Sequence, residues 1–262
     1  MRRIAALAVL LACTACQSTA RPIRVCADPN NLPFSDQAGT GFENALAELL
    51  ARDRGTRVEY TWWAQRRGFM RNTLNAGVCD VVMGVPADFA PALTTRPYYR
   101  SSYVFAARLD RVPRLASLDD PRLAQLRVGV QMIGDDFANT PPAHALAKRG
   151  LIGNVVGYSV YGDYSQPHPL SAIVSAVDRG EIDAALVWGP PAGYFARFSR
   201  YALALTPVSP EGDTASLPFV FDISMGVRRG DAALKAELDD FIVRRRAGID
   251  RILDGFGVPR VE

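Results

Sequence analysis

The chain has 262 residues, of which 48% are hydrophobic and 22% are charged, and its formal net charge at neutral pH is +3. This length allows one large domain or two modest ones, each with its own core. Removing an N-terminal export segment takes away only two of these charges, so the remaining chain lacks the basic field that nucleic acid or an anionic membrane would require.

The N-terminal segment has the pattern of an export signal. Arg2 and Arg3 precede an apolar run at residues 4–12, and small residues at 18–20 form a cleavage site. The apolar run is too short to cross a bilayer as a helix. The sequence LLAC ending at Cys13 also fits a lipoprotein cleavage box, which would leave a lipid on that cysteine. We therefore expect a periplasmic protein, with membrane contact only if Cys13 is lipidated.

Strand-like and helix-like runs alternate through the first part of the chain. Apolar strand patterns occupy residues 23–27, 58–62 and 81–83, and residues 68–76 predict a helix that ends at Gly77. An earlier helix is indicated by a stripe at helical spacing, formed by Phe42, Ala45, Leu46, Leu49 and Leu50. The predicted order is therefore strand, helix, strand, helix, strand.

A second unit of the same kind follows strand 103–105 and a charged, proline-bearing stretch at 108–121. Its predicted strands are 126–130, 155–160 and 183–187, with one helix beginning near Pro141 and another over residues 170–177. Alternation of this kind is typical of parallel sheets whose right-handed crossovers place helices on both faces.

The last part of the chain predicts one strand, at 219–227, and one long helix, at 231–254. Because a single strand and helix cannot form a domain, we expect them to return to the first lobe. The predicted organisation is a signal peptide at 1–20, lobe 1 at 21–106, lobe 2 at 107–210, and the return of lobe 1 at 211–262.

This order of elements resembles the periplasmic solute-binding proteins of the amino-acid-binding type. The resemblance implies an α/β periplasmic binding protein type II fold, with two doubly wound sheets joined by a two-segment hinge. Ligands of such sheets bind beyond the carboxyl ends of the strands, here in the cleft between the lobes.

Polar and aromatic residues follow the predicted strands where that cleft would lie, as small-ligand sites require. Each also has a purely structural interpretation as a turn, core or fold-fixing residue. Gln65, Tyr161 and Tyr164 are among these strand-end residues, and the predicted cleft set is Asp28, Asn30, Asn31, Phe34, Trp62, Trp63, Arg66, Arg67, Gly84, Pro86, Gln131, Gly134, Asp135, Asp163 and Trp188.

Signatures of catalysis and of metal binding are scarce. His144 and His168 are the only histidines, and neither lies near cysteines or acids at metal-ligand spacing. There is no nucleophile elbow, phosphate loop or dinucleotide fingerprint. We expect no catalytic residue, no metal site and no cofactor.

The chain departs from the amino-acid binders at both ligand anchors. Those proteins usually carry Thr-x-x-Arg soon after the third strand, and its guanidinium clamps the ligand carboxylate. Residues 84–91 contain no arginine here, and Arg96 comes only later. Trp188 stands where those proteins place an aspartate for the ligand ammonium. An ordinary amino acid is therefore not the expected ligand.

Longer motifs narrow the resemblance. They are VCADPNNLPF at 25–34, YTWWAQRRGF at 60–69, LTTRPYYRS at 93–101, GDDFANTPPAH at 134–144 and FDISMGV at 221–227. Together they resemble the quinoprotein-dehydrogenase-associated J proteins of methanol-oxidation clusters (MoxJ/XoxJ type). The resemblance implies a non-catalytic accessory of a pyrroloquinoline-quinone alcohol dehydrogenase, with that enzyme and its c-type cytochrome as candidate partners.

Cys26 and Cys79 are the two cysteines outside the export segment. In the fold implied by the resemblance they lie on neighbouring strands, and an oxidising compartment favours a structural disulfide between them. A redox dithiol is the alternative, although the two are 53 positions apart without a CxxC motif.

Two other functions stay open. One is a transport receptor that delivers a small, non-amino-acid solute to a membrane permease. The other is a dehydratase acting on prephenate or arogenate, which would need a cleft acid and a carboxylate clamp, for which the candidates are Asp28, Asp135, Asp163 and Arg66.

Overall fold

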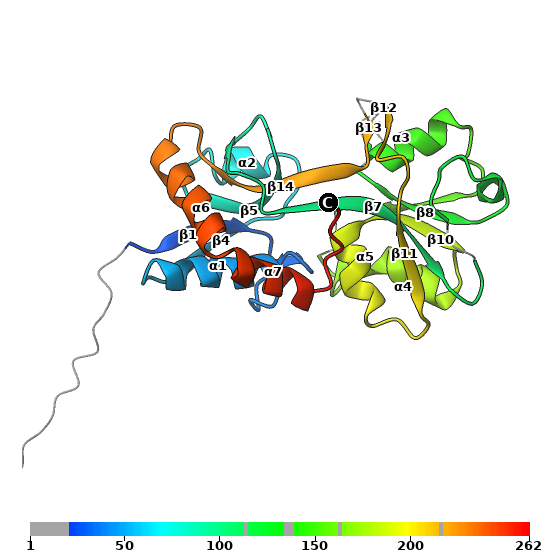
Figure 1. Ribbon diagram of the computed structural model, residues 1–262, viewed down its shortest axis with the longest axis horizontal. Coiled ribbons are helices and arrows are strands. Elements are labelled where there is room, and N and C mark those ends of the chain that lie inside the picture. Colours follow the sequence, from blue (N-terminus) through cyan, green and yellow to red (C-terminus); the bar gives the residue numbers. More distant parts are fainter. Residues whose placement is uncertain (1–20, 113–114, 134–138, 162–163, 215–216) are drawn as a thin grey trace, which may run out of the picture.

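The computed structural model describes residues 21–112, 115–133, 139–161, 164–214 and 217–262. Two α/β lobes lie side by side, and one long strand passes from the first lobe into the second (Figure 1). None of the helices in this described part of the chain combines the length and apolar composition that a membrane crossing requires.

The sheet of the first lobe is built on β1 (Ile23–Ala27), which pairs in parallel with β4 (Val58–Trp62) and β5 (Val81–Pro86). Helix α1 (Phe42–Asp53) follows β1, and α2 (Phe69–Asn72) follows β4. The predicted order of elements is therefore confirmed. The second helix is much shorter than predicted.

Helix α1 packs on this sheet through the face that the sequence pattern indicates. Phe42, Leu46 and Leu50 are fully buried in the core of lobe 1. The same core receives apolar side chains of β1, β5 and the C-terminal helices. Small strands complete the lobe, namely β2 (Asn30–Asn31), β3 (Ser35–Asp36) and β6 (Leu93–Thr94).

The second lobe has a parallel set of strands formed by β8 (Val128–Met132), β9 (Val155–Ser159) and β10 (Ala184–Trp188). The predicted helices are present as α3 (Pro141–Lys148) and α4 (Ala172–Arg179). The remaining elements are η1 (Pro121–Ala124), η2 (Pro169–Ser171), α5 (Gly189–Ala196), β11 (Leu203–Pro207), β12 (Gly212–Thr214) and β13 (Leu217–Pro218). Apart from η2, which lies at the start of the helix predicted over 170–177, none of these elements was predicted.

The two lobes are joined by β7 (Tyr99–Arg108) and β14 (Val220–Val227). The first four residues of β7 pair antiparallel with β14, and its later residues pair with β10 and β11. The sheets of both lobes therefore form one ten-stranded sheet, with the order β4-β1-β5-β14-β7-β10-β8-β9 and with β6 and β11 off this path. The predicted hinge segments are thus strands that are hydrogen-bonded to each other.

The C-terminal part returns to the first lobe from β14 onward, whereas β13 still contacts α3 and Phe219 still packs in the core of the second lobe. Strand β14 lies antiparallel to β5, and α6 (Ala232–Arg244) and α7 (Arg246–Gly255) follow. Asp231 caps α6 by accepting a hydrogen bond from the Leu234 amide at 3.2 Å. The predicted single helix is two helices, because Arg245 (φ −105°, ψ 16°) leaves the helical conformation.

The predicted disulfide between Cys26 and Cys79 is confirmed, with their Cα atoms 5.4 Å apart. It links β1 to the start of β5. Next to it, the Asp80 carboxylate accepts hydrogen bonds from Arg24 at 2.6 Å and Arg228 at 2.9 Å. Burial alone would raise the pKa of Asp80, but the two guanidinium groups hold it at about 2.

Replacing Asp80 with asparagine is expected to lower the free energy of unfolding by about 2 kcal/mol at neutral pH. The change leaves two guanidinium groups without their shared carboxylate, and their partial exposure keeps the loss below that of a fully buried pair. Urea denaturation measures the effect, with Asp240→Asn, an exposed change on α6, as control. Equal stability of the two variants would show that the ion pairs of Asp80 with Arg24 and Arg228 do not stabilise the packing of β1, β5 and β14.

Candidate functional site

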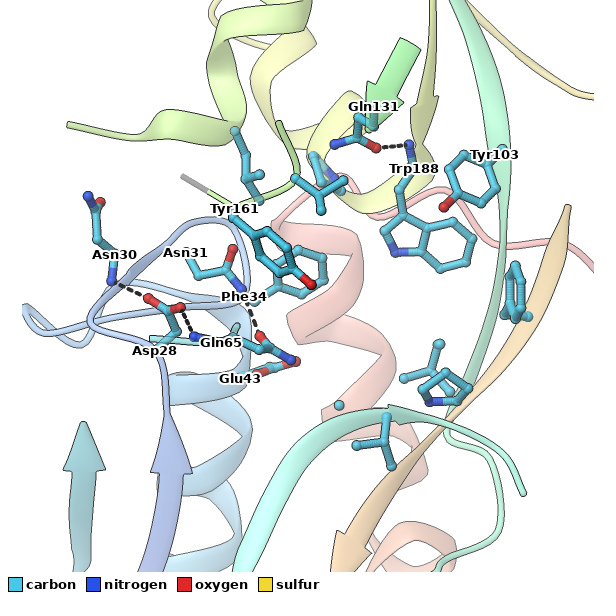
Figure 2. Close-up of a pocket in the computed structure, with 18 of the residues that line it drawn as sticks. Asp28, Asn30, Asn31, Phe34, Glu43, Gln65, Tyr103, Gln131, Tyr161 and Trp188 are labelled. Carbon is cyan, nitrogen blue, oxygen red and sulfur yellow. Dashed lines mark hydrogen bonds between the residues drawn. The ribbon is translucent and has the colours of Figure 1, made fainter. Parts of the chain in front are cut away.

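A cavity of about 370 Å³ lies between the lobes, beyond the carboxyl ends of β1, β5, β8 and β10. This volume falls in the range of small-molecule sites. Its walls are mainly apolar and aromatic, and Figure 2 shows polar groups gathered on the side that carries Asp28 and Glu43. The lining residues are Asp28, Asn30, Asn31, Phe34, Glu43, Gln65, Gly84, Val85, Pro86, Tyr99, Tyr103, Gln131, Val160, Tyr161, Tyr164, Leu170, Trp188, Pro191, Phe221 and Ile223.

Eight of the fifteen predicted cleft residues line this cavity. They are Asp28, Asn30, Asn31, Phe34, Gly84, Pro86, Gln131 and Trp188. Gly134, Asp135 and Asp163 lie outside the described residues. That any of these residues contacts a ligand stays a prediction.

The other four predicted residues are not among the described residues that line the cavity. Trp62 stacks on Tyr60 with ring centroids 4.5 Å apart, against the core of lobe 1. Trp63 is 46% exposed. Arg66 and Arg67 are exposed on the same segment.

Asp28 organises the polar side of the cavity from the end of β1. Its carboxylate accepts hydrogen bonds from the backbone amides of Asn30, at 2.8 Å, and Gln65, at 2.6 Å. The carboxylate is almost fully buried and also accepts the hydroxyl of Tyr164. Three donors therefore compensate its charge, as a buried carboxylate requires.

The contact with Tyr164 joins the lobes, because this tyrosine belongs to the second. Two further contacts lie beside it. The side-chain amide of Asn30 donates to the carbonyl of Gln166 at 2.9 Å, and the Arg66 guanidinium lies 4.7 Å from the centre of the Tyr164 ring. These three contacts bridge the two lobes at one edge of the cavity.

Replacing Tyr164 with phenylalanine is expected to shift the protein toward an open form. The change removes a hydrogen bond to a carboxylate, worth about 1.5–3 kcal/mol, and thus lowers the closed-to-open ratio by roughly ten- to hundredfold. Small-angle X-ray scattering should show a larger radius of gyration than that of Tyr161→Phe, a control in the same wall. Identical scattering of both variants would contradict a role for Tyr164 in closure.

Glu43 lies in the first turn of α1, at the edge of the open space in Figure 2. Its backbone amide donates to the carbonyl of Phe34 at 2.8 Å, which fixes the start of the helix. The accessible part of its side chain faces the cavity. Burial, and secondarily the negative charge of Asp28, raise the pKa of Glu43 to about 8. This carboxyl is therefore largely protonated at neutral pH.

The opposite wall is aromatic. Trp188, at the end of β10, contacts Tyr103 of β7 and Phe221 of β14 at ring-centroid distances of 5.3 and 5.8 Å. These edge-to-face contacts hold the three rings together. The side-chain oxygen of Gln131 accepts the backbone amide of Trp188 at 2.9 Å, which orients the end of β10.

The sequence prediction missed the wall that the hinge strands supply. Tyr99, Tyr103 and Phe221 line the cavity from β7 and β14, whereas the predicted set contains residues that follow the carboxyl ends of strands. Glu43 was also missed, although a signal existed. It lies three, four and seven residues before Leu46, Ala47 and Leu50, so it belongs to the buried face of α1.

Within the described ranges, no three His, Cys, Asp or Glu side chains gather where they could hold a metal ion. His144 accepts the Asn139 amide at 3.2 Å, and neither it nor His168 is among the residues that line the interlobe cavity.

Comparison with known proteins identifies relatives across nearly the whole chain, although no family model matches it. The protein MoxJ of Methylorubrum extorquens is 33% identical over 260 residues, which cover 95% of this chain and 84% of MoxJ. The crystal structure of the periplasmic binding protein XoxJ from Methylobacterium extorquens AM1 is also 33% identical. It matches with a TM-score of 0.75 over 92% of this chain and 99% of XoxJ.

A third match supports the fold. The crystal structure of MxaJ from Methlophaga aminisulfidivorans MPT has a TM-score of 0.76 over 91% of this chain and all of MxaJ, at 23% identity. The predicted periplasmic binding protein type II fold is thereby confirmed. Such binding proteins are a non-catalytic class, and the relatives imply a periplasmic location. With its cavity between two α/β lobes and a relative this similar over 95% of its length, the chain belongs to the MoxJ/XoxJ family of periplasmic binding proteins.

Proposed function

We propose that this chain is a non-catalytic periplasmic accessory protein that assists or activates a pyrroloquinoline-quinone-dependent methanol or alcohol dehydrogenase. It would do so by binding the enzyme, or a small ligand, in the interlobe cavity. The observation that carries the proposal is the 33% identity to MoxJ over 95% of the chain. The c-type cytochrome of the dehydrogenase is a further candidate partner.

The cavity and the hinge give this role a physical basis. Lobes joined by two strands and bridged by a few side-chain contacts would supply an element that can open and close. A ligand or protein segment that prefers one state shifts the balance between them by its difference in affinity.

The test deletes the gene and assays periplasmic alcohol dehydrogenase after the quinone cofactor and its metal have been supplied. We expect activity to fall and to return with a plasmid-borne copy, and the dehydrogenase to co-purify with a tagged chain. Unimpaired activity in the deletion strain, together with no co-purification, would contradict the proposal.

A second candidate function is a transport receptor for a small, non-amino-acid solute. The observation that favours it is the cavity of about 370 Å³ with closing contacts at one edge. A receptor of this kind should be stabilised by its solute by about 2.7 kcal/mol at a hundredfold excess over the dissociation constant. A permease encoded beside the gene would support this function, whereas a neighbouring dehydrogenase and cytochrome would support the first.

A further inference from the structure

The charged side chains among the described residues that line the interlobe cavity are all acidic. The described residues that line it include the carboxyl groups of Asp28 and Glu43, and none of them is lysine, arginine or histidine. A ligand carboxylate or phosphate would contact no cation among these lining residues, and the Asp28 carboxylate would repel it. The Arg66 guanidinium is not part of the lining and lies against the Tyr164 ring. The described wall therefore disfavours anionic ligands.

The two carboxyl groups differ in what they already bind. Asp28 accepts the amides of Asn30 and Gln65 and the hydroxyl of Tyr164, so its oxygens serve the closure of the lobes. No hydrogen bond or ion pair joins the Glu43 carboxyl to any described residue. Glu43 is therefore the acid whose side chain is available to a ligand.

The position of the Glu43 carboxyl depends on the glycine opposite it. A Cβ atom added to Gly84, which lies within β5, would overlap Oε1 of Glu43, so any other residue at this position would displace that carboxyl. The absence of a side chain at this position lets the acid lie along the cavity edge. Figure 2 shows it beside Gln65, across the open space from Trp188.

The far wall offers aromatic and apolar surface. The rings of Tyr103, Trp188 and Phe221 stand together, with Ile223 and Pro191 beside them in the lining. Such surface buries a hydrocarbon or aromatic body, and aromatic rings also attract organic cations.

We propose that the cavity binds a small organic cation, an amine with an apolar or aromatic body and no carboxylate. Its ammonium group would lie against Glu43, and its body would lie against Tyr103, Trp188 and Phe221. This ligand class deepens the proposed function and rests on the chain being a binding protein. The ammonium would supply the partner that the Glu43 carboxyl lacks among the described residues.

The test uses the purified chain and two sets of matched probes. The aromatic set is phenethylamine, phenethyl alcohol, hydrocinnamate and phenylalanine; the aliphatic set is hexylamine, hexanol and hexanoate. Isothermal titration calorimetry should show that each amine binds at least tenfold more tightly than its alcohol, and that hydrocinnamate, phenylalanine and hexanoate do not bind. Amine binding near pH 7 should also release protons, seen as a dependence of the measured heat on the buffer.

Two variants assign the effect to one carboxyl. Glu43→Gln should weaken amine binding at least tenfold, abolish the proton release and lower the ratio of amine affinity to alcohol affinity. Glu48→Gln, an exposed change on the same helix, should behave as the wild type. Circular dichroism establishes that both variants are folded.

Three results would overturn the inference: neither amine binds, an acid binds as tightly as its amine, or the two glutamine variants bind amines equally. The accessory role is judged separately, from dehydrogenase activity in the deletion strain. If the amines fail to bind, the accessory role can still hold. If the deletion strain keeps its dehydrogenase activity, the ligand class measured by calorimetry can still hold.

Discussion

Glu43→Gln is expected to make the protein more stable than the wild type at pH 8 and to leave the two nearly equal near pH 4.5. The pKa of Glu43 is raised from an ordinary value of 4.5 to about 8, so the folded state binds more protons than the unfolded state between these values. The stabilisation that comes from this difference in proton binding is fully present below pH 4.5, and it is lost as the pH rises through 8. At 1.36 kcal/mol per pH unit, the difference reaches at most about 5 kcal/mol.

Thermal and urea unfolding of ligand-free protein between pH 5 and 9 measures this effect. The free energy of unfolding of the wild type should fall with pH more steeply than that of Glu43→Gln. Glu48→Gln should follow the wild type, because its carboxyl is exposed. Parallel curves for all three proteins would show that the Glu43 carboxyl ionises in the folded state as it does in water.

Replacing both Cys26 and Cys79 with alanine should lower the free energy of unfolding by about 4 kcal/mol. The bridge closes a loop between residues 53 positions apart, and removing it restores conformational entropy to the unfolded chain. For a protein of this size, the loss corresponds to a fall in melting temperature of roughly 10 °C.

Chemical denaturation of the double variant measures the loss, and the wild type denatured in a reducing agent provides the matched comparison. The two should agree closely, since both lack the cross-link. A loss below about 1 kcal/mol in both would mean that the bridge contributes little to stability.

The sequence predicted those strands and helices whose hydrophobic pattern is clear. Apolar runs placed the parallel strands, and the stripe on α1 placed its buried face. Helix α5 was not predicted because it begins with Gly189, Pro190 and Pro191, residues that favour turns over helices. A tertiary contact explains the second glycine of this helix. The carbonyl oxygen of Gly257 lies where a Cβ atom at position 193 would be, so Gly193 cannot carry a side chain.

Prediction of the candidate site was limited by its reliance on strand ends. That rule places Asp28, Gln131 and Trp188 at the cavity because parallel strands end there. It gives no information on Tyr103 and Phe221, whose position depends on β7 and β14 pairing across the hinge. Nor does strand order alone reveal that the segment after β4 turns Trp63 and Arg66 to the outside.

The central claim is that the chain assists the dehydrogenase through its interlobe cavity. Pro86 lies at the exposed end of the cavity lining, so Pro86→Trp fills the cavity without entering the core. Pro91→Trp makes the same change on an exposed neighbouring segment. Periplasmic alcohol dehydrogenase activity, measured in deletion strains that carry each folded variant, should fall to the deletion level with Pro86→Trp and stay at the wild-type level with Pro91→Trp. Full activity with both variants would contradict the account.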